Sequence, residues 1–270
     1  MPELPEVETT RRGLQVHLVG RTLQRVVVRQ RQLRYPVPAR VEAAVVGEEV
    51  VALERRAKYL LIRLGGGAWL LLHLGMSGSL RLVAETDAPG RHDHVDLVLN
   101  DGRAVRLTDP RRFGCLLLGD GDPQDHRLLR RLGPEPLGSA FDGAVLHRAA
   151  RGRRVAVKAL LMDATVVVGV GNIYANEALF RAGIRPDRAA GRIARARYDR
   201  LAGAVRAVLE AALAAGGTTL RDFTDGSGEP GYFAVNLSVY GASVCPVCGG
   251  ALRQIRLAQR GTWFCPRCQR

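Results

Sequence analysis

Lysine is almost absent from this sequence. Of its 40 lysines and arginines, only Lys58 and Lys158 are lysine. The simplest explanation is a genome that favours arginine codons. Arginine keeps its proton, however, whereas lysine can act as an acid or a base. We therefore expect that at least one of the two lysines has a function that arginine could not replace.

Long apolar runs are also lacking. The most apolar stretch, YLLIRLGGGAWLLLHLG, is interrupted by Arg63 and by a cluster of glycines, so it does not predict a transmembrane helix. The first residues do not combine a basic region with an apolar one, so we expect no signal peptide. These features predict a cytoplasmic protein with no membrane partner.

Acidic residues are too few to balance the basic ones. The formal net charge is +14, and 47% of the 270 residues are hydrophobic. That length and composition predict a folded chain of two modest domains with a real core. The excess of positive charge favours a polyanionic partner, most simply nucleic acid.

Cysteine is missing from the first 114 residues, and four of the five cysteines lie near the end of the chain. They form two C-x-x-C pairs, a spacing typical of a four-thiolate zinc site, although paired disulfides are the alternative. Four thiolates leave no open position on the metal, which predicts one structural Zn²⁺. Between the pairs, ALRQIRL and GTWF read as two strands joined by AQRG, and Arg260 stands at this turn. The expected ligands are Cys245, Cys248, Cys265 and Cys268.

The chain begins MPELPEVETTRR, which is acidic for so basic a protein. A short helix over 5–14 explains part of this, because Glu6 and Glu8 would lie at its positive N-terminal end. Gly13 suits its other terminus. The helix does not explain Glu3, which precedes it.

The sequence pattern differs between the two halves of the chain. From about 20 to 118, short Val- and Leu-rich runs broken by Gly, Pro or Asp predict a β-sandwich or barrel, and NDG at 100–102 predicts a hairpin. After LGPEPLG, apolar residues recur at helical spacing. We expect an α+β multidomain protein with a boundary near residue 130.

Several loops favour contacts with nucleic acid. HLGMSGSL places Met76 in a turn, and TDPRRFG displays Arg111, Arg112 and Phe113. Paired arginines beside an aromatic ring can bind phosphates or base edges and stack or wedge. Each loop alone is more often ordinary surface or core.

Two further motifs are less specific. VVGVGNIYA enters a helix at Asn172, a plausible N-cap beside amides that could bind a phosphate. HDHVD, which begins at His92, could suggest a metal. Its residues alternate along a strand, so we favour a DNA contact or a structural role instead.

Taken together, MPELPEVET, RRAKYLL, HLGMSGSL, DPRRFG, VVGVGNIYA, PGYF and the four-cysteine module closely resemble the bacterial formamidopyrimidine-DNA glycosylases over essentially the whole chain. The resemblance implies a base-excision-repair enzyme that removes oxidised purines (8-oxoguanine and formamidopyrimidines) from duplex DNA and cleaves the backbone by β,δ-elimination. It also implies an N-terminal catalytic β-sandwich (1–131), a helical helix–two-turns–helix domain with a lesion-capping loop (132–235) and a zinc-finger hairpin (236–270). The expected form is a monomer associated with the bacterial nucleoid.

The same resemblance implies catalytic roles. Pro2 matches the nucleophile exposed by removal of Met1, Glu3 the general acid/base, and Lys58 the proton donor for β-elimination. Glu6 matches a second active-site carboxylate. Arg260 matches the residue of δ-elimination, although its stable positive charge favours binding a phosphate.

Other positions match DNA contacts of the family. Met76, Arg111 and Phe113 match the residues that fill the gap left by an everted nucleotide. Lys158 matches a lysine near the damaged base, and the loop at 221–237 matches the cap over a flipped base. The remaining implied contacts are His73, His92, Arg153 and Asn172, with arginine at 153 where the family pattern suggests lysine.

Two other functions compete with this interpretation. An endonuclease VIII-type glycosylase for oxidised pyrimidines shares the Pro–Glu start, but the ELPEVET continuation and the set Met76, Arg111 and Phe113 favour the purine enzyme. A non-catalytic zinc-finger protein that binds damaged DNA would need neither Pro2 nor Lys58.

Overall fold

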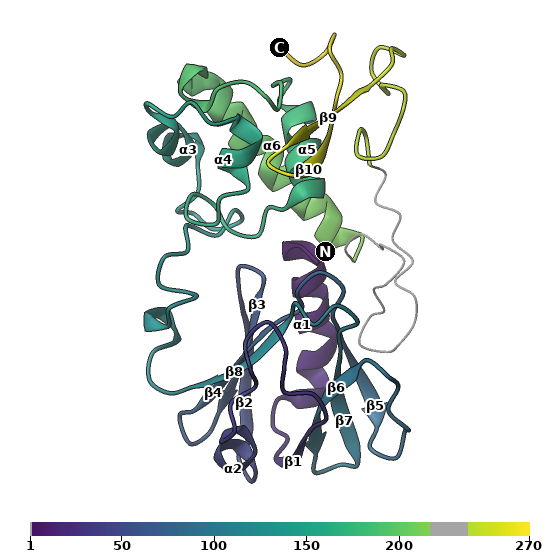
Figure 1. Cartoon of the computed structure of the whole chain (residues 1–270). Coiled ribbons are helices and arrows are strands. Elements are labelled where there is room, and N and C mark those ends of the chain that lie inside the picture. Colours follow the sequence, from purple (N-terminus) through teal and green to yellow (C-terminus); the bar gives the residue numbers. More distant parts are fainter. Residues whose placement is uncertain (1, 217–236) are drawn as a thin grey trace. The chain divides into compact units, whose positions relative to one another are not determined.

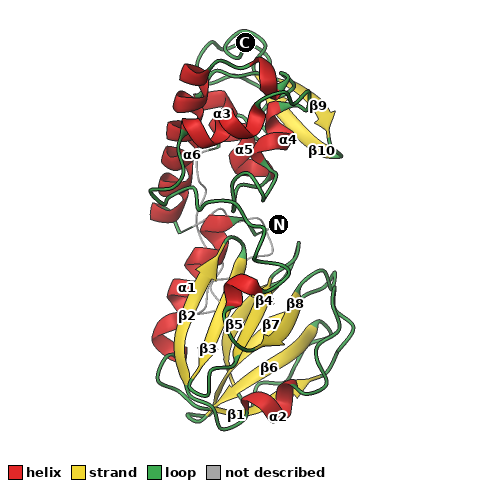
Figure 2. Ribbon diagram, turned by 90° about the vertical axis from the view of Figure 1, so that its left-hand side faces the viewer, coloured by secondary structure: helices red, strands yellow, loops and turns green. Residues whose placement is uncertain are grey.

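The computed structural model describes residues 2–216 and 237–270. Of these, 2–130 and Gly216 belong to a first unit, and 131–215 and 237–270 to a second. The first unit is built mainly from strands, and the second from helices and a C-terminal hairpin (Figures 1 and 2). Among the described residues, no helix is long and apolar enough to cross a membrane.

The first unit contains two four-stranded antiparallel sheets. In spatial order, one sheet holds β1 (Leu23–Val28), β6 (Asp93–Leu99), β7 (Arg103–Thr108) and β5 (Ser79–Ala84). The other holds β2 (Val50–Arg56), β3 (Tyr59–Leu64), β4 (Trp69–His73) and β8 (Cys115–Gly119). Leucines and valines from both sheets fill one core, which confirms the predicted sandwich. The expected hairpin at NDG connects β6 to β7.

Helix α1 (Leu4–Leu18) packs against β2 and β3 of one sheet and β5 of the other. The prediction that it ends at residue 14, with Gly13 in its terminus, was wrong. The helix continues because Leu14 and Leu18, on the same face, are 1% and 0% exposed in the core. Burial of these two side chains outweighs the modest helix propensity of one glycine, a penalty of about 1 kcal/mol.

The loops of this unit carry two short helical turns. Helix α2 (Val41–Val45) lies after β1, and a 3-10 turn, η1 (Pro123–Asp125), follows β8. Strands β2 and β3 are joined by only two residues, Ala57 and Lys58. This tight turn fixes the position of Lys58 at the end of the hairpin.

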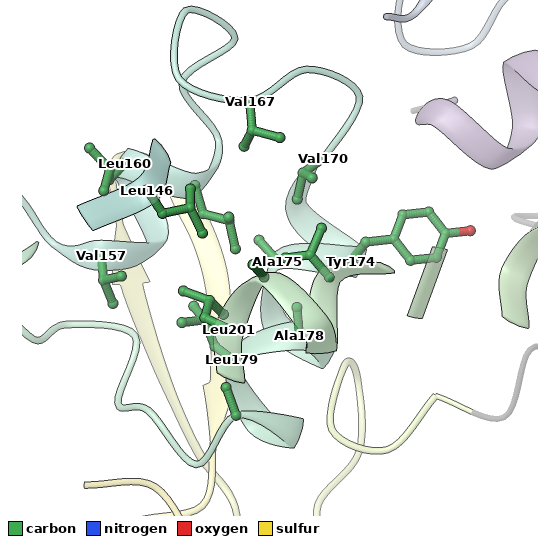
Figure 3. Close-up of a cluster of buried hydrophobic side chains, with 14 of the residues drawn as sticks. Leu146, Val157, Leu160, Val167, Val170, Tyr174, Ala175, Ala178, Leu179 and Leu201 are labelled. Carbon is green, nitrogen blue, oxygen red and sulfur yellow. The ribbon is translucent and has the colours of Figure 1, made fainter. Parts of the chain in front are cut away.

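In the second unit, helix α5 (Asn172–Arg181) packs against α6 (Arg195–Ala214) and α4 (Val157–Leu161), while α3 (Gly143–Ala150) packs against α6 and the 3-10 turn η2 (Ala190–Arg192). Every residue of α5 from Ile173 to Phe180 is buried, as expected for a helix enclosed on all sides. Figure 3 shows its Ala175, Ala178 and Leu179 among side chains of α3, α4 and α6.

The C-terminal hairpin consists of β9 (Arg253–Leu257) and β10 (Arg260–Phe264). The two-residue turn between them is Ala258–Gln259, with φ values of 45° and 62°. Arg260 therefore opens β10, opposite Leu257, rather than standing in the turn as the sequence suggested.

The hairpin and the segment before it are joined to α5 by polar side chains. Asn176 Oδ1 accepts a hydrogen bond from the Trp263 amide at 2.9 Å. The Glu177 carboxylate accepts from three consecutive amides, those of Ser238, Val239 and Tyr240, at 2.8 to 2.9 Å. The C-terminal segment is thus anchored to the buried core of the second unit.

Candidate active site and nucleic-acid interface

The start of α1 places Pro2 in front of two buried carboxylates. Pro2 is half-buried, whereas Glu3 and Glu6 are 2% and 4% exposed. Glu3 is the N-cap residue, and the two glutamates form a capping box in which Glu6 Oε2 accepts a hydrogen bond from the Glu3 amide at 2.8 Å. The acids at the chain start therefore shape the backbone that presents Pro2.

Glu8, two residues after Glu6, binds different partners. Its carboxylate accepts hydrogen bonds from Arg11, Arg12 and Arg55 at 2.8 to 3.1 Å. Burial raises its pKa, but the three arginines outweigh burial and lower the pKa to about 2. Glu8 thus stays ionised and ties α1 to the end of β2.

Arg55, one of the three arginines bound to Glu8, also contacts the turn that carries Lys58. Arg55 donates through Nε to Glu8 at 3.0 Å and through Nη1 to the Ala57 carbonyl at 2.9 Å. Ala57 has a φ of 55°, a conformation that non-glycine residues seldom adopt. Lys58 is half-buried at this turn.

His73, at the end of β4, lies close enough to Lys58 to feel its charge. Burial lowers the pKa of His73 to about 4, and the positive charges of Lys58 and Arg34 add to the effect. Its Nδ1 accepts a hydrogen bond from the Gly75 amide at 2.9 Å, so the neutral ring carries its proton on Nε2. Nε2–H can then donate to a neighbouring acceptor.

The loops 74–78 and 109–114 display the three residues expected to enter DNA. Met76 is half-buried, Phe113 is 45% exposed, and Arg111 is exposed with its guanidinium 5.0 Å from the Phe113 ring centroid. An arginine stacked on a phenylalanine holds both side chains in a defined arrangement. The two loops belong to one unit and touch each other.

The HDHVD segment leads into β6, which begins at its second residue, Asp93. Asp93 accepts from Thr108, Arg81 and the Gly90 amide, while Asp96 accepts from Arg29 and Arg106. Both carboxylates bind side chains of neighbouring strands, which agrees with the structural interpretation of this motif. His92 is half-buried and precedes the strand.

In the second unit, Lys158 is 1% exposed on α4. Its ammonium donates to Asn172 Oδ1 at 2.7 Å, to the Gly261 carbonyl at 3.0 Å and to Thr262 Oγ1 at 2.7 Å. Direct contact between Lys158 and DNA would require some of these hydrogen bonds to be exchanged. The arrangement instead connects α4, α5 and the strand that begins with Arg260.

Asn172 is the first residue of α5, and Gly171 is the N-cap, so the prediction of Asn172 as the cap was wrong by one position. Gly169 has a φ of 79°, a conformation that suits glycine in the turn before the helix. Arg260 is half-buried. Arg153 is exposed, and its Nη1 lies 3.5 Å from Asp163 Oδ2.

The four C-terminal cysteines converge on one point. Their sulfur atoms all lie within 4.8 Å of one another, with Sγ–Sγ distances of 3.8 Å for Cys245–Cys268 and 3.6 Å for Cys248–Cys265. A tetrahedron with Zn–S bonds of about 2.3 Å has edges of about 3.8 Å. The four thiolates therefore fit one structural Zn²⁺, and they form the zinc finger that the spacing predicted.

The described contacts place the predicted site residues in two groups. Pro2, Glu3, Glu6, Lys58 and His73 belong to the first unit, together with the loops of Met76 and Phe113. Lys158, Asn172, Arg260, Arg153 and the zinc cluster belong to the second. Most of residues 221–237, the expected capping loop, lies outside the described residues.

Sequence reasoning missed the supporting side chains. It did not single out Asn176, Glu177, Thr262 or Asp109, and it gave Arg55 no role. Asp109 stands before Pro110, which marks a turn, but only the fold reveals its partners.

Comparison with known proteins identifies the family. Three family models match: the formamidopyrimidine-DNA glycosylase N-terminal domain over residues 1–116, its H2TH domain over 132–224, and the zinc finger found in FPG and IleRS over 242–270. The formamidopyrimidine-DNA glycosylases of Alkalilimnicola ehrlichii and Stutzerimonas stutzeri are 61% and 57% identical to the chain, with full coverage of both partners in each case.

Solved structures agree. The MutM (FPG) protein from Thermus thermophilus has a TM-score of 0.89 and 42% identity, covering 99% of this chain and 98% of that one. The Lactococcus lactis Fpg in complex with DNA containing an abasic site has a TM-score of 0.91 and 30% identity, covering 99% of both chains. On this full-length likeness, the chain belongs to the formamidopyrimidine-DNA glycosylase family.

Proposed function

We propose that Pro2 is the nucleophile of this enzyme and that Glu3, Glu6 and Lys58 move the protons of its reaction. As a family member, the chain is a DNA glycosylase and AP lyase that acts on oxidised purines in base excision repair. The observation that carries the proposal is the position of Pro2, partly exposed in front of the Glu3–Glu6 capping box.

The chemistry follows from the terminal secondary amine. Once Met1 is removed, the Pro2 nitrogen can attack C1′ of the damaged nucleotide, and the base leaves as its bond to C1′ breaks. The sugar ring then opens as the C1′–O4′ bond breaks and O4′ takes a proton, which leaves a positively charged iminium between Pro2 and C1′ that withdraws electrons from the sugar. A free α-amino group has a pKa of about 8, and the positive end of α1 disfavours its protonated form.

The carboxylates and the lysine supply proton transfers. A carboxyl of Glu3 or Glu6 can protonate the sugar ring oxygen as the base leaves. Loss of the C2′ proton then expels the 3′ phosphate in β-elimination, and we assign the proton donor of this step to Lys58. A second elimination expels the 5′ phosphate, with Arg260 binding the negative charge.

The remaining predicted residues would hold the DNA. Met76 and Phe113 fill the gap left by the everted nucleotide, while Arg111 faces the unpaired opposite base. Eversion costs a few kcal/mol, part of which these contacts offset. The proposed phosphate and backbone contacts are His73, His92, Arg153 and Asn172, with Lys158 positioning Asn172 and the start of β10 from its buried site.

The structural Zn²⁺ would be held by Cys245, Cys248, Cys265 and Cys268, and it would fix the fold around the β9–β10 hairpin that presents Arg260. We further propose three functional segments, 1–131, 132–235 and 236–270. The partner is damaged duplex DNA, as in complexes of Lactococcus lactis Fpg, and the enzyme acts as a monomer in the cytoplasm, at the nucleoid.

Borohydride trapping tests the nucleophile. Reduction of the iminium should leave a covalent adduct between the protein and DNA that contains an abasic site. Pro2→Gly should weaken this adduct strongly, whereas Pro36→Gly, at an exposed proline of a loop, should leave it unchanged. Mass measurement of the intact chain first establishes that Met1 has been removed. If no adduct forms with the processed enzyme, the assignment of Pro2 is wrong.

A second experiment tests the preferred lesion. We expect faster excision of 8-oxoguanine opposite cytosine than of thymine glycol. The comparison is informative because a Lactococcus lactis Fpg structure contains DNA with an oxidised pyrimidine. Faster release of thymine glycol would contradict the proposed preference.

A further inference from the structure

Asp109, the residue after β7, is completely buried and has no part in the chemistry proposed above. Its Oδ1 accepts a hydrogen bond from the Ser77 hydroxyl at 3.1 Å and from the Arg111 amide at 3.3 Å. Its Oδ2 accepts from the Gly114 amide at 2.7 Å. One carboxylate therefore binds the residue after Met76 and residues on both sides of Phe113.

The backbone of Asp109 is held as firmly as its side chain. Its amide donates to the His92 carbonyl at 3.0 Å, and its carbonyl accepts from the Arg112 amide at 3.2 Å. The same carbonyl lies 2.8 Å from His94 Nε2. Because a carbonyl can only accept, His94 donates this bond. Hydrogen bonds to His92 and His94 thus fix the backbone of Asp109 at the start of β6, and its side chain contacts the two loops.

The two loops also meet backbone to backbone. A Cβ atom at Gly75 would lie 2.4 Å from the Gly114 nitrogen and from the Phe113 carbonyl carbon. A Cβ atom at Gly114 would lie 2.7 Å from the His73 carbonyl oxygen and 3.0 Å from Asp109 Oδ2. No side chain fits between the loops at these two glycines, and the Asp109 carboxylate hydrogen-bonds to both loops beside them.

We propose that Asp109 is a positioning residue that holds the loop of Met76 and the loop of Arg111 and Phe113 as one rigid unit, so that the three side chains enter the DNA together. The inference rests on the void-filling role proposed for these residues. It goes further by naming a fully buried group that acts through both loops.

A carboxylate suits this task better than an amide of the same size. It offers only acceptors, and its described side-chain partners are all donors. Asparagine would turn one acceptor into an NH₂ group that faces an N–H or O–H donor. Asp109→Asn should therefore release one loop while keeping the volume of the side chain.

The test compares a step that needs eversion of a paired base with one that does not. Single-turnover excision of 8-oxoguanine opposite cytosine requires the lesion to leave the stack. Cleavage at a preformed abasic site in the same duplex has no damaged base to unstack. We expect Asp109→Asn and Ser77→Ala to slow excision about three- to tenfold, the effect of losing one buried hydrogen bond, with abasic-site cleavage changed less than about twofold.

Two controls make the result specific. Asp101→Asn makes the same chemical change in the β6–β7 turn and should alter neither rate. In a Met76→Ala background, Ser77→Ala should cause no further loss of excision, because the loop would then have no Met76 side chain to position. Urea unfolding shows whether each variant is folded. If Asp109→Asn does not fold, Ser77→Ala still tests the proposal.

Three outcomes would overturn the inference. Equal losses on both substrates would assign Asp109 to general stability, and unchanged excision in folded variants would show that the loops need no such anchor. If Ser77→Ala and Met76→Ala slow excision additively, Ser77 does not act through Met76. If Met76→Ala combined with Phe113→Ala also leaves excision unchanged, the void-filling proposal fails as well. If that double variant is slow and Asp109→Asn is not, only the positioning role fails.

Discussion

At the scale of single residues, the acids of the chain start divide by function. Glu3 and Glu6 shape the first turn of α1, whereas Glu8 joins three arginines. The sequence predicted the helix and its favourable acidic end, but not the partner on β2. That partner, Arg55, is distant in sequence and becomes a neighbour only when the hairpin packs on the helix.

Glu8→Gln should destabilise the enzyme. The folded pKa of Glu8, about 2, lies below its ordinary value of 4.5. The stabilisation is therefore present above pH 4.5 and is lost as the pH falls toward 2. After allowance for solvent screening we expect a loss of about 1–2 kcal/mol at pH 7. Urea unfolding should show this loss disappearing at low pH, and the exposed Glu54→Gln should show none at either pH.

His73 should make stability depend on mildly acidic pH. Its folded pKa of about 4 lies below the ordinary value of 6.5, so the unfolded chain binds the extra proton first. Stability is full above pH 6.5 and falls between pH 6.5 and 4, by at most about 3 kcal/mol. His73→Asn keeps an acceptor for the Gly75 amide but cannot titrate. Urea unfolding at pH 7.5, 6 and 5 should give a smaller decline for the variant, and equal declines would refute the assignment.

At the scale of elements, local patterns predicted the sandwich, the β6–β7 hairpin, the helical character of the second unit and the zinc hairpin. The errors lie at element ends. Gly13 lies within α1 because Leu14 and Leu18 are buried on the sheets, and Asn172 follows its cap rather than forming it. Arg260 begins β10 because Ala258 and Gln259 make the turn. Tertiary packing decides such boundaries, and a local pattern does not record it.

The candidate site was predictable to a similar degree. Chain-wide motifs pointed to Pro2, Lys58 and the void-filling loops, and the cysteine spacing alone indicated the metal. The contacts that hold these groups in place could not be predicted, because Arg55, Asp109 and Lys158 bind partners that are far away in sequence.

Lys158→Met should loosen the connection between α4, α5 and the zinc hairpin. The variant removes a buried ammonium and leaves three acceptors, on Asn172, Gly261 and Thr262, without this donor. We expect a loss of about 2–4 kcal/mol in unfolding free energy and faster hydrogen exchange of the β10 amides. The exposed Arg153→Met removes a charge from the same unit and serves as the control. Unchanged exchange in Lys158→Met would contradict the bridging role.

At the scale of the whole molecule, charge governs the encounter with DNA. The net charge of +14 belongs to the whole chain and attracts a polyanion, whereas only a few residues are proposed to contact the DNA directly. Affinity should therefore depend strongly on salt, through the counterions that phosphate contacts release.

We expect duplex affinity to fall roughly a hundredfold between 50 and 200 mM salt, as about four phosphate contacts require. Arg260→Ala should reduce the slope of log affinity against log salt by about one. Arg40→Ala, at an exposed arginine before α2, should leave the slope nearly unchanged. Fluorescence anisotropy over a salt series measures both slopes, and equal slopes would remove Arg260 from the phosphate contacts.

The hydrogen bonds from the amides of Ser238, Val239 and Tyr240 to Glu177 limit how the zinc finger could be transferred to another protein. A finger transplanted as residues 237–270 into another scaffold would bring its four thiolates and its hairpin, but it would leave these three amides without their acceptor and the Trp263 amide without Asn176. The transferable piece is therefore the finger together with α5. In this chain the metal module and the helix form one hydrogen-bonded part.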